Sequence, residues 1–330
     1  MTDAAPHNSR TDSPIVAVTR TVPGALEVPG ASVRTLGDDH PARDELLAFV
    51  RGSSILVSMF SDRVDAELLD AAGESLRGVC NFAVGFNNID LDACRERDIP
   101  VTNTPDAVTE GTADIAWMLI LAVARRLIEG DRFARTGAWQ RHGPLGMAEF
   151  LGMDLTGRTL LIVGAGRIGY AVAARAKAWG MRVLYTARTR KWNMELAPIA
   201  GEWVELDDGL ARADVVSVHT PLTDETHHLI DARRLALMKP TAILVNTARG
   251  PVVDEAALAD ALRAKRLWGA GLDVFEREPE IHEGLLDLDN VTMTPHIGSA
   301  EVRFREAMTR MVADNAHAIL EGRPPPNLVS

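Results

Sequence analysis

Cysteine is scarce in this 330-residue sequence, in which only Cys80 and Cys94 occur. Two isolated cysteines provide neither a disulfide framework nor a cysteine-based metal site, and they favour the reducing cytoplasm. A long apolar run is also missing. The most apolar stretch, residues 115–124, stops at two arginines and is far shorter than the ~20 residues that span a bilayer. We therefore expect a cytoplasmic protein that has no membrane segment.

Basic residues are outnumbered, with 35 lysines and arginines against 46 aspartates and glutamates and a formal net charge of -11. Nucleic-acid binding depends on clustered positive charge, so this balance argues against a nucleic-acid partner, whereas a small anionic substrate needs only local positive charge. The sequence also lacks the G-x-S-x-G element of a hydrolase and the H-E-x-x-H spacing of a zinc site. We therefore expect neither a serine or cysteine hydrolase nor a metal site.

Apolar residues make up 46% of the chain and charged residues 25%, as in globular proteins, and 330 residues suffice for two domains of roughly 150 residues each. A polar stretch of 13 residues at the start lacks the features of a secretory signal and predicts a flexible tail. Strand-like and helix-like segments then alternate. The strand-like segments are residues 15–18, 55–58 and 99–102, and the helix-like segments are residues 42–50 and 65–72. This alternation predicts a parallel α/β sheet.

A long apolar-periodic segment over residues 109–126 predicts a helix that leads into a second domain. A second strand-helix series follows, from Thr159 to about Pro295. The last segment, about residues 299–322, predicts an amphipathic helix that returns to the first domain and makes that domain discontinuous. We expect a tail over residues 1–13, a substrate domain from residues 14–106 and 299–330, and a dinucleotide-binding domain over residues 107–298.

A glycine-rich turn follows the buried-strand pattern of residues 160–163, in the order Gly164-Ala165-Gly166-Arg167-Ile168-Gly169. This is G-x-G-x-x-G between a strand and a helix. The first glycine allows a tight turn, the second lets the backbone approach a pyrophosphate, and the third brings the helix against the strand. The anion would lie at the helix N-terminus. Because another strand pattern follows at residues 183–185, the motif predicts a dinucleotide site.

The residue that distinguishes NAD from NADP is expected at the end of this second strand, where an acidic side chain would bind the ribose 2′-hydroxyl. Ala187 occupies that point, and Arg188, Thr189, Arg190 and Lys191 follow. The carboxylate that would repel a 2′-phosphate is missing, and cations that could bind it are present. The run therefore favours NADPH, with NADH also possible. A solvated basic turn is the alternative.

Three further segments carry reactive side chains at or just after strands. They are Asn246 to Gly250, Asp273 to Pro279 and Thr294 to Gly298. In a doubly wound sheet the carboxyl ends of strands border the ligand crevice. Arg249 suits a substrate carboxylate, because a guanidinium can bind two oxygens at once. His296 suits proton exchange with a carbonyl oxygen, and Glu278 could hold its tautomer. Together these residues indicate carbonyl reduction, although each has an ordinary structural interpretation when taken singly.

These segments, with several others, resemble the D-2-hydroxyacid dehydrogenase family, and most closely its glyoxylate and hydroxypyruvate reductases. The matching segments are Val84 to Asp90, Thr102 to Asp114, Gly164 to Gly169, Tyr185 to Lys191, Asn246 to Asp254, Gly271 to Pro279 and Pro295 to Ala300. The resemblance implies two Rossmann-like α/β domains with parallel sheets, in which the nucleotide-binding domain is inserted into a flavodoxin-like substrate domain.

The resemblance also implies residue roles. Arg249 would bind the substrate carboxylate and polarise the keto oxygen, while His296, paired with Glu278, would donate the proton as hydride arrives. The backbone amides of Val84 and Gly85 would hold the carboxylate. Met59 would border the substrate side chain, together with Phe60. The implied cofactor-binding residues are Thr109, Gly164, Gly166, Arg167, Ile168, Gly169, Arg188, Thr189, Arg190, Thr220, Pro221, Thr247, Ala248 and Asp273, of which Asp273 would face the nicotinamide amide.

Members of the family usually form dimers through the segment that corresponds to residues 107–147, so a homodimer is expected here. Trp139 in this segment could reach the partner's active site, but its sequence setting departs from the usual one. The expected function is NADPH-preferring reduction of small 2-oxo acids such as glyoxylate and hydroxypyruvate. Two alternatives stay open. One is an NAD-linked dehydrogenase for a D-lactate-like acid or for phosphite, and the other is a dinucleotide-sensing scaffold similar to the C-terminal-binding corepressors.

Overall fold

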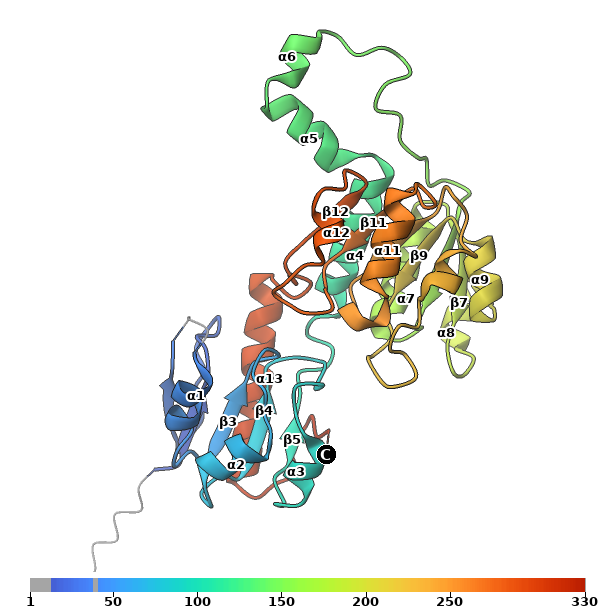
Figure 1. Ribbon diagram of the computed structural model, residues 1–330. Helices are drawn as coiled ribbons and strands as arrows, with labels where there is room; N and C mark the ends of the chain where they lie inside the picture. Colours follow the sequence, from blue (N-terminus) through green and yellow to red (C-terminus); the bar gives the residue numbers. More distant parts are fainter. Residues whose placement is uncertain (1–12, 38–40, 330) are drawn as a thin grey trace, which may run out of the picture. The chain divides into compact units, whose positions relative to one another are not determined.

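A computed structural model describes residues 13–37 and 41–329 of the chain, drawn in Figure 1. These residues divide into two compact units. The first unit is formed by the described residues up to Ala107 together with those from Glu301 onward, and the second is formed by Val108–Ala300. The second unit is thus inserted into the sequence of the first. Each unit has a parallel sheet of its own.

The first unit has the strand order β2-β1-β3-β4-β5, which is the flavodoxin-like order. Its strands are β1 (Ile15–Val18), β2 (Ser32–Thr35), β3 (Ile55–Ser58), β4 (Gly78–Asn81) and β5 (Val101–Thr102). All their pairings are parallel. The central strands β3 and β4 are buried along their whole length, which explains why they read as continuous apolar or small residues rather than as an alternating pattern.

Helices cover both faces of this sheet. They are α1 (Arg43–Phe49), α2 (Ala66–Ala72), α3 (Leu91–Arg95) and α13 (Val302–Leu320). Leu46 of α1 and Leu68 of α2 join Leu56 and Val79 in one core cluster. On the other face α13 packs against β3 and β4. A Cβ atom at Gly78 would lie 2.7 Å from Cδ1 of Ile319, so this helix approaches β4 too closely for a larger residue at that point.

The second unit has the strand order β12-β11-β10-β9-β6-β7-β8, again with parallel pairings throughout. Its strands are β6 (Thr159–Val163), β7 (Arg182–Thr186), β8 (Glu202–Trp203), β9 (Val215–Val218), β10 (Ile243–Asn246), β11 (Gly269–Leu272) and β12 (Val291–Met293). The chain order reverses between β6 and β9, which are neighbours in the sheet. This is the arrangement of a Rossmann fold, in which ligands bind beside the reversal.

Two core clusters flank this sheet. The helices are α4 (Thr109–Ala124), α5 (Leu127–Arg135), α6 (Ala138–His142), α7 (Arg167–Ala178), α8 (Trp192–Glu195), α9 (Leu206–Arg212), α10 (Ala232–Leu235), α11 (Glu255–Arg263) and α12 (Glu283–Leu286), with a short 3-10 helix η1 (Gly250–Val252). One cluster packs α4 and α7 against the sheet, and the other packs α9, α10 and α11 against the opposite face. Figure 1 shows α5 and α6 extending away from this sheet.

The predicted fold class is confirmed, because both sheets are parallel α/β sheets and one unit is inserted into the other. The helix expected over about residues 109–126 is present as α4, which covers Thr109–Ala124. Arg126 adopts a left-handed conformation with φ 53°, so α4 ends at Ala124 and α5 starts at Leu127. Within residues 13–37 and 41–329 no helix has the length and apolar character needed to cross a membrane. The expected N-terminal tail lies almost wholly outside the described residues.

Candidate active site

The glycine-rich turn between β6 and α7 has the geometry expected of a dinucleotide loop. Gly164 has φ 98°, and a Cβ atom there would lie 2.8 Å from the His219 carbonyl group. At Gly169 a Cβ atom would lie 2.4 Å from the carbonyl oxygen of Gly164. Packing within the chain therefore requires both glycines. At Gly166, by contrast, none of the described residues lies within 4 Å of the Cβ position, so open space remains where a ligand could approach the backbone.

Unpartnered polar groups border the same turn. The hydroxyls of Thr220, after β9, and Thr247, after β10, are buried and have no hydrogen-bond partner within residues 13–37 and 41–329. The ring of His219 is fully enclosed, and burial lowers its pKa to about 3, so it is neutral. Buried hydroxyls normally have partners. These groups, together with the space at Gly166, fit a dinucleotide lying across the carboxyl ends of β6, β9 and β10.

The two arginines that follow β7, Arg188 and Arg190, have different surroundings. Both Nε and Nη2 of Arg190 donate to the Glu195 carboxylate, at 2.8 and 2.6 Å, and its guanidinium lies over the ring of Trp192. Glu195 also accepts from the hydroxyl of Tyr185 at 2.6 Å. Arg188 is exposed and makes no hydrogen bond or ion pair in the described part of the chain, and its charge acts only at longer range on the Glu225 carboxylate. Arg188 is therefore the more available cation for a phosphate.

The predicted catalytic residues lie on adjoining segments at the carboxyl ends of β10, β11 and β12. Nδ1 of His296 lies 2.7 Å from Oε2 of Glu278, and the other carboxylate oxygen accepts from the backbone N–H of Phe275 at 3.0 Å. Arg249 follows β10, and its charge acts on Glu278. The structure thus brings together an arginine, a carboxylate and a histidine in one unit.

The charges of these three residues are coupled. Burial lowers the pKa of the Arg249 guanidinium, and the nearby Glu278 carboxylate opposes that effect. Burial alone would raise the pKa of Glu278. The hydrogen bond from His296 and the charges of His296 and Arg249 outweigh it, so the pKa of Glu278 lies below its ordinary value. Glu278 is therefore held as a carboxylate, which accepts from Nδ1 of His296 and so fixes the tautomer and orientation of the ring.

The turn that carries His296 is fastened by Asp273. The Asp273 carboxylate accepts hydrogen bonds from the Thr294 hydroxyl at 2.6 Å and from the N–H groups of Ile297 and Gly298, both at 2.8 Å. His296 itself has φ 53°, in the left-handed region that non-glycine residues seldom adopt. Burial raises the pKa of Asp273, while the three hydrogen bonds act in the opposite direction. Asp273 thus holds the strained backbone of His296 in place.

In the first unit, the segment after β4 presents backbone amides. The side chain of Asn103 donates to the Val84 carbonyl, and that of Asn81 donates to the Gly85 carbonyl, both at 2.8 Å. The N–H groups of Val84 and Gly85 make no hydrogen bond within residues 13–37 and 41–329. Side-chain amides fix the carbonyls while the two N–H groups stay available, which is how backbone can form an anion site. The sequence analysis missed these asparagines, whose contacts span up to 19 residues.

Other predicted residues take the following places. Met59 directly follows β3 and is buried, its N–H bonded to the Asp62 carboxylate at 2.8 Å, whereas Phe60 is exposed. Thr109 is the first residue of α4. The remaining predicted cofactor residues lie at the start of α7 or just after strands, and they are Arg167, Ile168, Thr189, Pro221 and Ala248.

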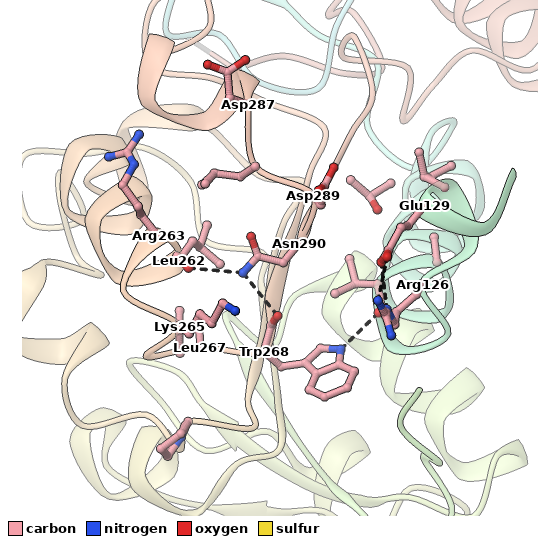
Figure 2. A pocket seen from close by; sticks show the side chains of 16 residues that line it. Arg126, Glu129, Leu262, Arg263, Lys265, Leu267, Trp268, Asp287, Asp289 and Asn290 are labelled. Atoms are coloured by element: carbon pink, nitrogen blue, oxygen red, sulfur yellow. Dashed lines mark hydrogen bonds and ion pairs between the residues drawn. The ribbon is translucent and has the colours of Figure 1, made fainter. Parts of the chain in front are cut away.

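A groove of about 630 Å³ lies elsewhere in the second unit. Pro240, Trp268 and Asn290, which line it, come just before β10, β11 and β12, so the groove is at the amino ends of these strands. Figure 2 shows the Asn290 side chain pointing at the carbonyls of Leu262 and Trp268, each 3.4 Å from its Nδ2. Arg126 and Glu129 at the rim pair with each other at 2.6 Å. The groove is thus separate from the predicted catalytic residues, which follow the same strands.

The Rossmann order, the glycine loop and the histidine-carboxylate pair together define a dinucleotide-dependent oxidoreductase type of site. Residues 117–298 match the family described as "D-isomer specific 2-hydroxyacid dehydrogenase, NAD binding domain". A glyoxylate reductase of Thermococcus onnurineus is 52% identical over 298 residues, which cover 89% of this chain and 88% of the relative. The chain therefore belongs to the D-isomer specific 2-hydroxyacid dehydrogenase family.

Solved structures agree with this assignment. A protein from Thermus thermophilus has a TM-score of 0.89 and 47% identity, over 96% of this chain and 100% of that one. An NADPH-dependent glyoxylate/hydroxypyruvate reductase from Sinorhizobium meliloti, solved with NADP and malonate, has a TM-score of 0.81 and 32% identity, over 96% of this chain and 97% of that one. The family resemblance inferred from the sequence segments is confirmed.

Proposed function

We propose that this protein is a cytoplasmic, NADPH-preferring reductase that converts small 2-oxo acids, such as glyoxylate and hydroxypyruvate, to 2-hydroxy acids. One observation carries the proposal. His296 and Glu278 are paired at 2.7 Å beside Arg249, in the same unit as the glycine loop. Carbonyl reduction needs a carboxylate anchor and a proton donor next to a hydride source, and this edge of the sheet supplies the first two.

Each of the three residues has a distinct role in the proposed reaction. Arg249 binds the substrate carboxylate and polarises the keto oxygen, because its guanidinium offers several N–H groups in one plane. His296 donates a proton to the oxygen that becomes the hydroxyl. Since Nδ1 faces Glu278, Nε2 is the nitrogen that delivers this proton. Glu278 holds the ring and stabilises the charged imidazolium before the proton leaves.

A bound nicotinamide dinucleotide supplies the hydride that adds to the carbonyl carbon. The groups proposed to hold it are the N–H groups at the start of α7, the turn from Gly164 to Gly169, and the hydroxyls of Thr220 and Thr247. Thr109, Pro221 and Ala248 are proposed to line the same site. Asp273 is proposed to face the nicotinamide amide while its carboxylate fastens the turn that carries His296. The unpartnered hydroxyls and the space at Gly166 support this assignment.

The preference for NADPH rests on Arg188 and Thr189 as ligands of the 2′-phosphate. An exposed, unpaired guanidinium next to a hydroxyl suits a phosphate, and no acidic side chain follows β7 directly. Arg190 is proposed to contribute less, because Glu195 and Trp192 already hold it. The Sinorhizobium meliloti relative is described as NADPH-dependent, which supports the same preference here.

The substrate is proposed to be small and anionic. Val84 and Gly85 offer backbone N–H groups as a further anchor for its carboxylate, and Met59 is proposed to border its side chain. The curated relative of Thermococcus onnurineus is a glyoxylate reductase, and the Sinorhizobium meliloti relative is a glyoxylate/hydroxypyruvate reductase. These names favour acids with short side chains.

A homodimer that uses the segment of residues 107–147 is also proposed. None of the residues of α5 and α6, all of which the structure describes, is buried. Their exposed apolar side chains include Leu127, Ile128 and Trp139, and Met147 in the following loop is 93% exposed. Several large apolar side chains exposed along one segment favour an interface there. Light scattering should give twice the monomer mass for the native chain and the monomer mass for Leu127→Glu; a native monomer would contradict the proposal.

The reaction is tested by following the absorbance of reduced nicotinamide with purified protein, NADPH or NADH, and a panel of 2-oxo acids. We expect the fastest oxidation with NADPH and either glyoxylate or hydroxypyruvate. Faster turnover of a bulkier acid would overturn the substrate assignment but keep the reaction class. Binding of dinucleotide without turnover of any acid would support the scaffold alternative.

A further inference from the structure

Two of the proposed catalytic residues come from separate loops that touch through their backbones. Arg249 and Gly250 follow β10, whereas Phe275, Glu276 and Glu278 follow β11. A Cβ atom at Gly250 would lie 1.9 Å from the Phe275 carbonyl carbon and 2.4 Å from the Glu276 nitrogen. No side chain fits between the two loops at this point. The distance between Arg249 and Glu278 therefore depends on how these backbones are held together.

A reciprocal pair of hydrogen bonds joins the same loops. The N–H of Glu255 donates to Oε1 of Glu276 at 3.0 Å, and the N–H of Glu276 donates to Oε1 of Glu255 at 2.5 Å. Glu255 is the first residue of α11 and is only 4% exposed. Each carboxylate thus satisfies the other residue's backbone. The loop of Arg249 packs closely against the loop of Glu278 at Gly250 and is hydrogen-bonded to it at its end, Glu255.

A third segment, which follows β9, contacts the Glu276 carboxylate through His228. Nε2 of His228 lies 3.0 Å from Oε1 of Glu276, and the backbone N–H of His228 donates to the Pro251 carbonyl at 2.7 Å. His228 has φ 48°, so its backbone is held in a seldom adopted conformation. The other titratable groups that face its ring are Asp254, 3.9 Å from Nδ1, and His227, whose ring stacks on it at 4.1 Å.

We infer that Glu276 is a positioning residue for catalysis, and that His228 holds its carboxylate in place. Glu276 connects the segments after β9, β10 and β11, from which the proposed cofactor residue Thr220 and the proposed catalytic residues Arg249 and Glu278 come. Its own carboxylate is already bound by His228 and Glu255, so it acts through these contacts. The inference rests on the proposed reductase function, because its effect is read from turnover of a 2-oxo acid.

The test compares Glu276→Ala with Glu276→Gln. The amide oxygen of glutamine can still accept from the Glu255 N–H, whereas alanine removes every side-chain contact. We expect Glu276→Ala to lower kcat/KM for hydroxypyruvate about tenfold or more, with a raised KM, while the Kd for NADPH changes less than about twofold. We expect Glu276→Gln to keep at least about half of the native kcat/KM. His228→Ala, which leaves the reciprocal pair intact, should lower kcat/KM about threefold.

Glu202→Ala is the matched control, since Glu202 is also a paired glutamate, 2.8 Å from Arg212, but lies on β8. It should match the native protein in every parameter. Native kcat/KM in Glu276→Ala would overturn the inference, as would a parallel loss of NADPH affinity. If Glu276→Ala does not fold, His228→Ala decides, because native kcat/KM in that variant would contradict the role given to His228. A native protein that reduces no acid would contradict the proposed function instead.

Discussion

The two ends of the sheet in the second unit use their polar residues differently. At the carboxyl ends of β10, β11 and β12, polar groups converge on one another, with His296 2.7 Å from Glu278 and three donors on Asp273. At the amino ends lies a groove of about 630 Å³. The charged residues at its rim do not converge on one point, because Arg126 forms an ion pair with its neighbour Glu129.

This difference is the reason why we place the proposed catalysis at the carboxyl ends of the strands and not in the groove. The groove could hold a small molecule, yet the described residues that line it include no histidine, and Arg126 at its rim is already paired with Glu129. The opposite end combines a strained histidine, a carboxylate held in its charged form and a half-buried arginine. A histidine paired with a carboxylate near an arginine is a stronger indication of a catalytic site than an open space.

The substitution Arg249→Ala is expected to have a large effect on catalysis. Loss of the guanidinium removes both the carboxylate anchor and the group that polarises the keto oxygen. We expect kcat/KM for glyoxylate or hydroxypyruvate to fall roughly 10²- to 10³-fold, the size typical for a lost charge-stabilising donor, with a raised KM. Steady-state kinetics at saturating NADPH measures this. Native kinetics would remove Arg249 from the mechanism and weaken the contrast between the two ends of the sheet.

A smaller effect, on the preference between NADPH and NADH, is expected from the arginines that follow β7. Arg188→Ala should reduce the preference for NADPH over NADH by about tenfold, or roughly 1.4 kcal/mol. Arg190→Ala should change it by less than half of that free energy, because the Arg190 guanidinium is already bound to Glu195. Titration of nicotinamide fluorescence gives both dissociation constants. Equal weakening of NADPH and NADH by Arg188→Ala would mean that this arginine has a structural role.

The smallest effect concerns pH. The pKa of Glu278 is lower in the folded chain than in the unfolded chain, so its ionisation stabilises the fold above the unfolded value, ordinarily about 4.3. That stabilisation is lost as the pH falls through the lower, folded value. Glu278→Gln lacks this contribution, so its Tm should fall by about 1–2 °C less than that of the native protein between about pH 6 and pH 3. A steeper fall in the variant would contradict the assigned direction.

Local patterns in the sequence sufficed to predict the parallel sheets and the glycine turn. The buried strand of residues 160–163 and the glycines after it carry their signal within about ten residues. The helix over residues 109–126 was predicted to within two residues of the observed end at Ala124, because the apolar pattern stops at Arg125 and Arg126. The left-handed backbone of Arg126, which separates α4 from α5, has no local signal in the sequence.

The contacts that organise the site were harder to predict. Glu276 meets Glu255 and His228 across 21 and 48 residues, and no local pattern links such positions. The capture of Arg190 by Glu195 spans only five residues, so a search for nearby opposite charges could have found it. The three donors on Asp273 depend on how the turn at residues 294–298 folds back, which propensities do not specify.

The most direct test of the account compares His296→Asn with Lys265→Ala in one assay of NADPH oxidation by hydroxypyruvate. His296 is paired at the carboxyl ends of the strands, and Lys265 lines the groove at their amino ends. We expect His296→Asn to lose turnover roughly 10²- to 10⁴-fold, as for a missing general acid, with unchanged NADPH binding, and Lys265→Ala to keep native turnover. A full rate in His296→Asn, or loss of turnover in Lys265→Ala alone, would contradict the assignment of catalysis to the carboxyl ends of the sheet.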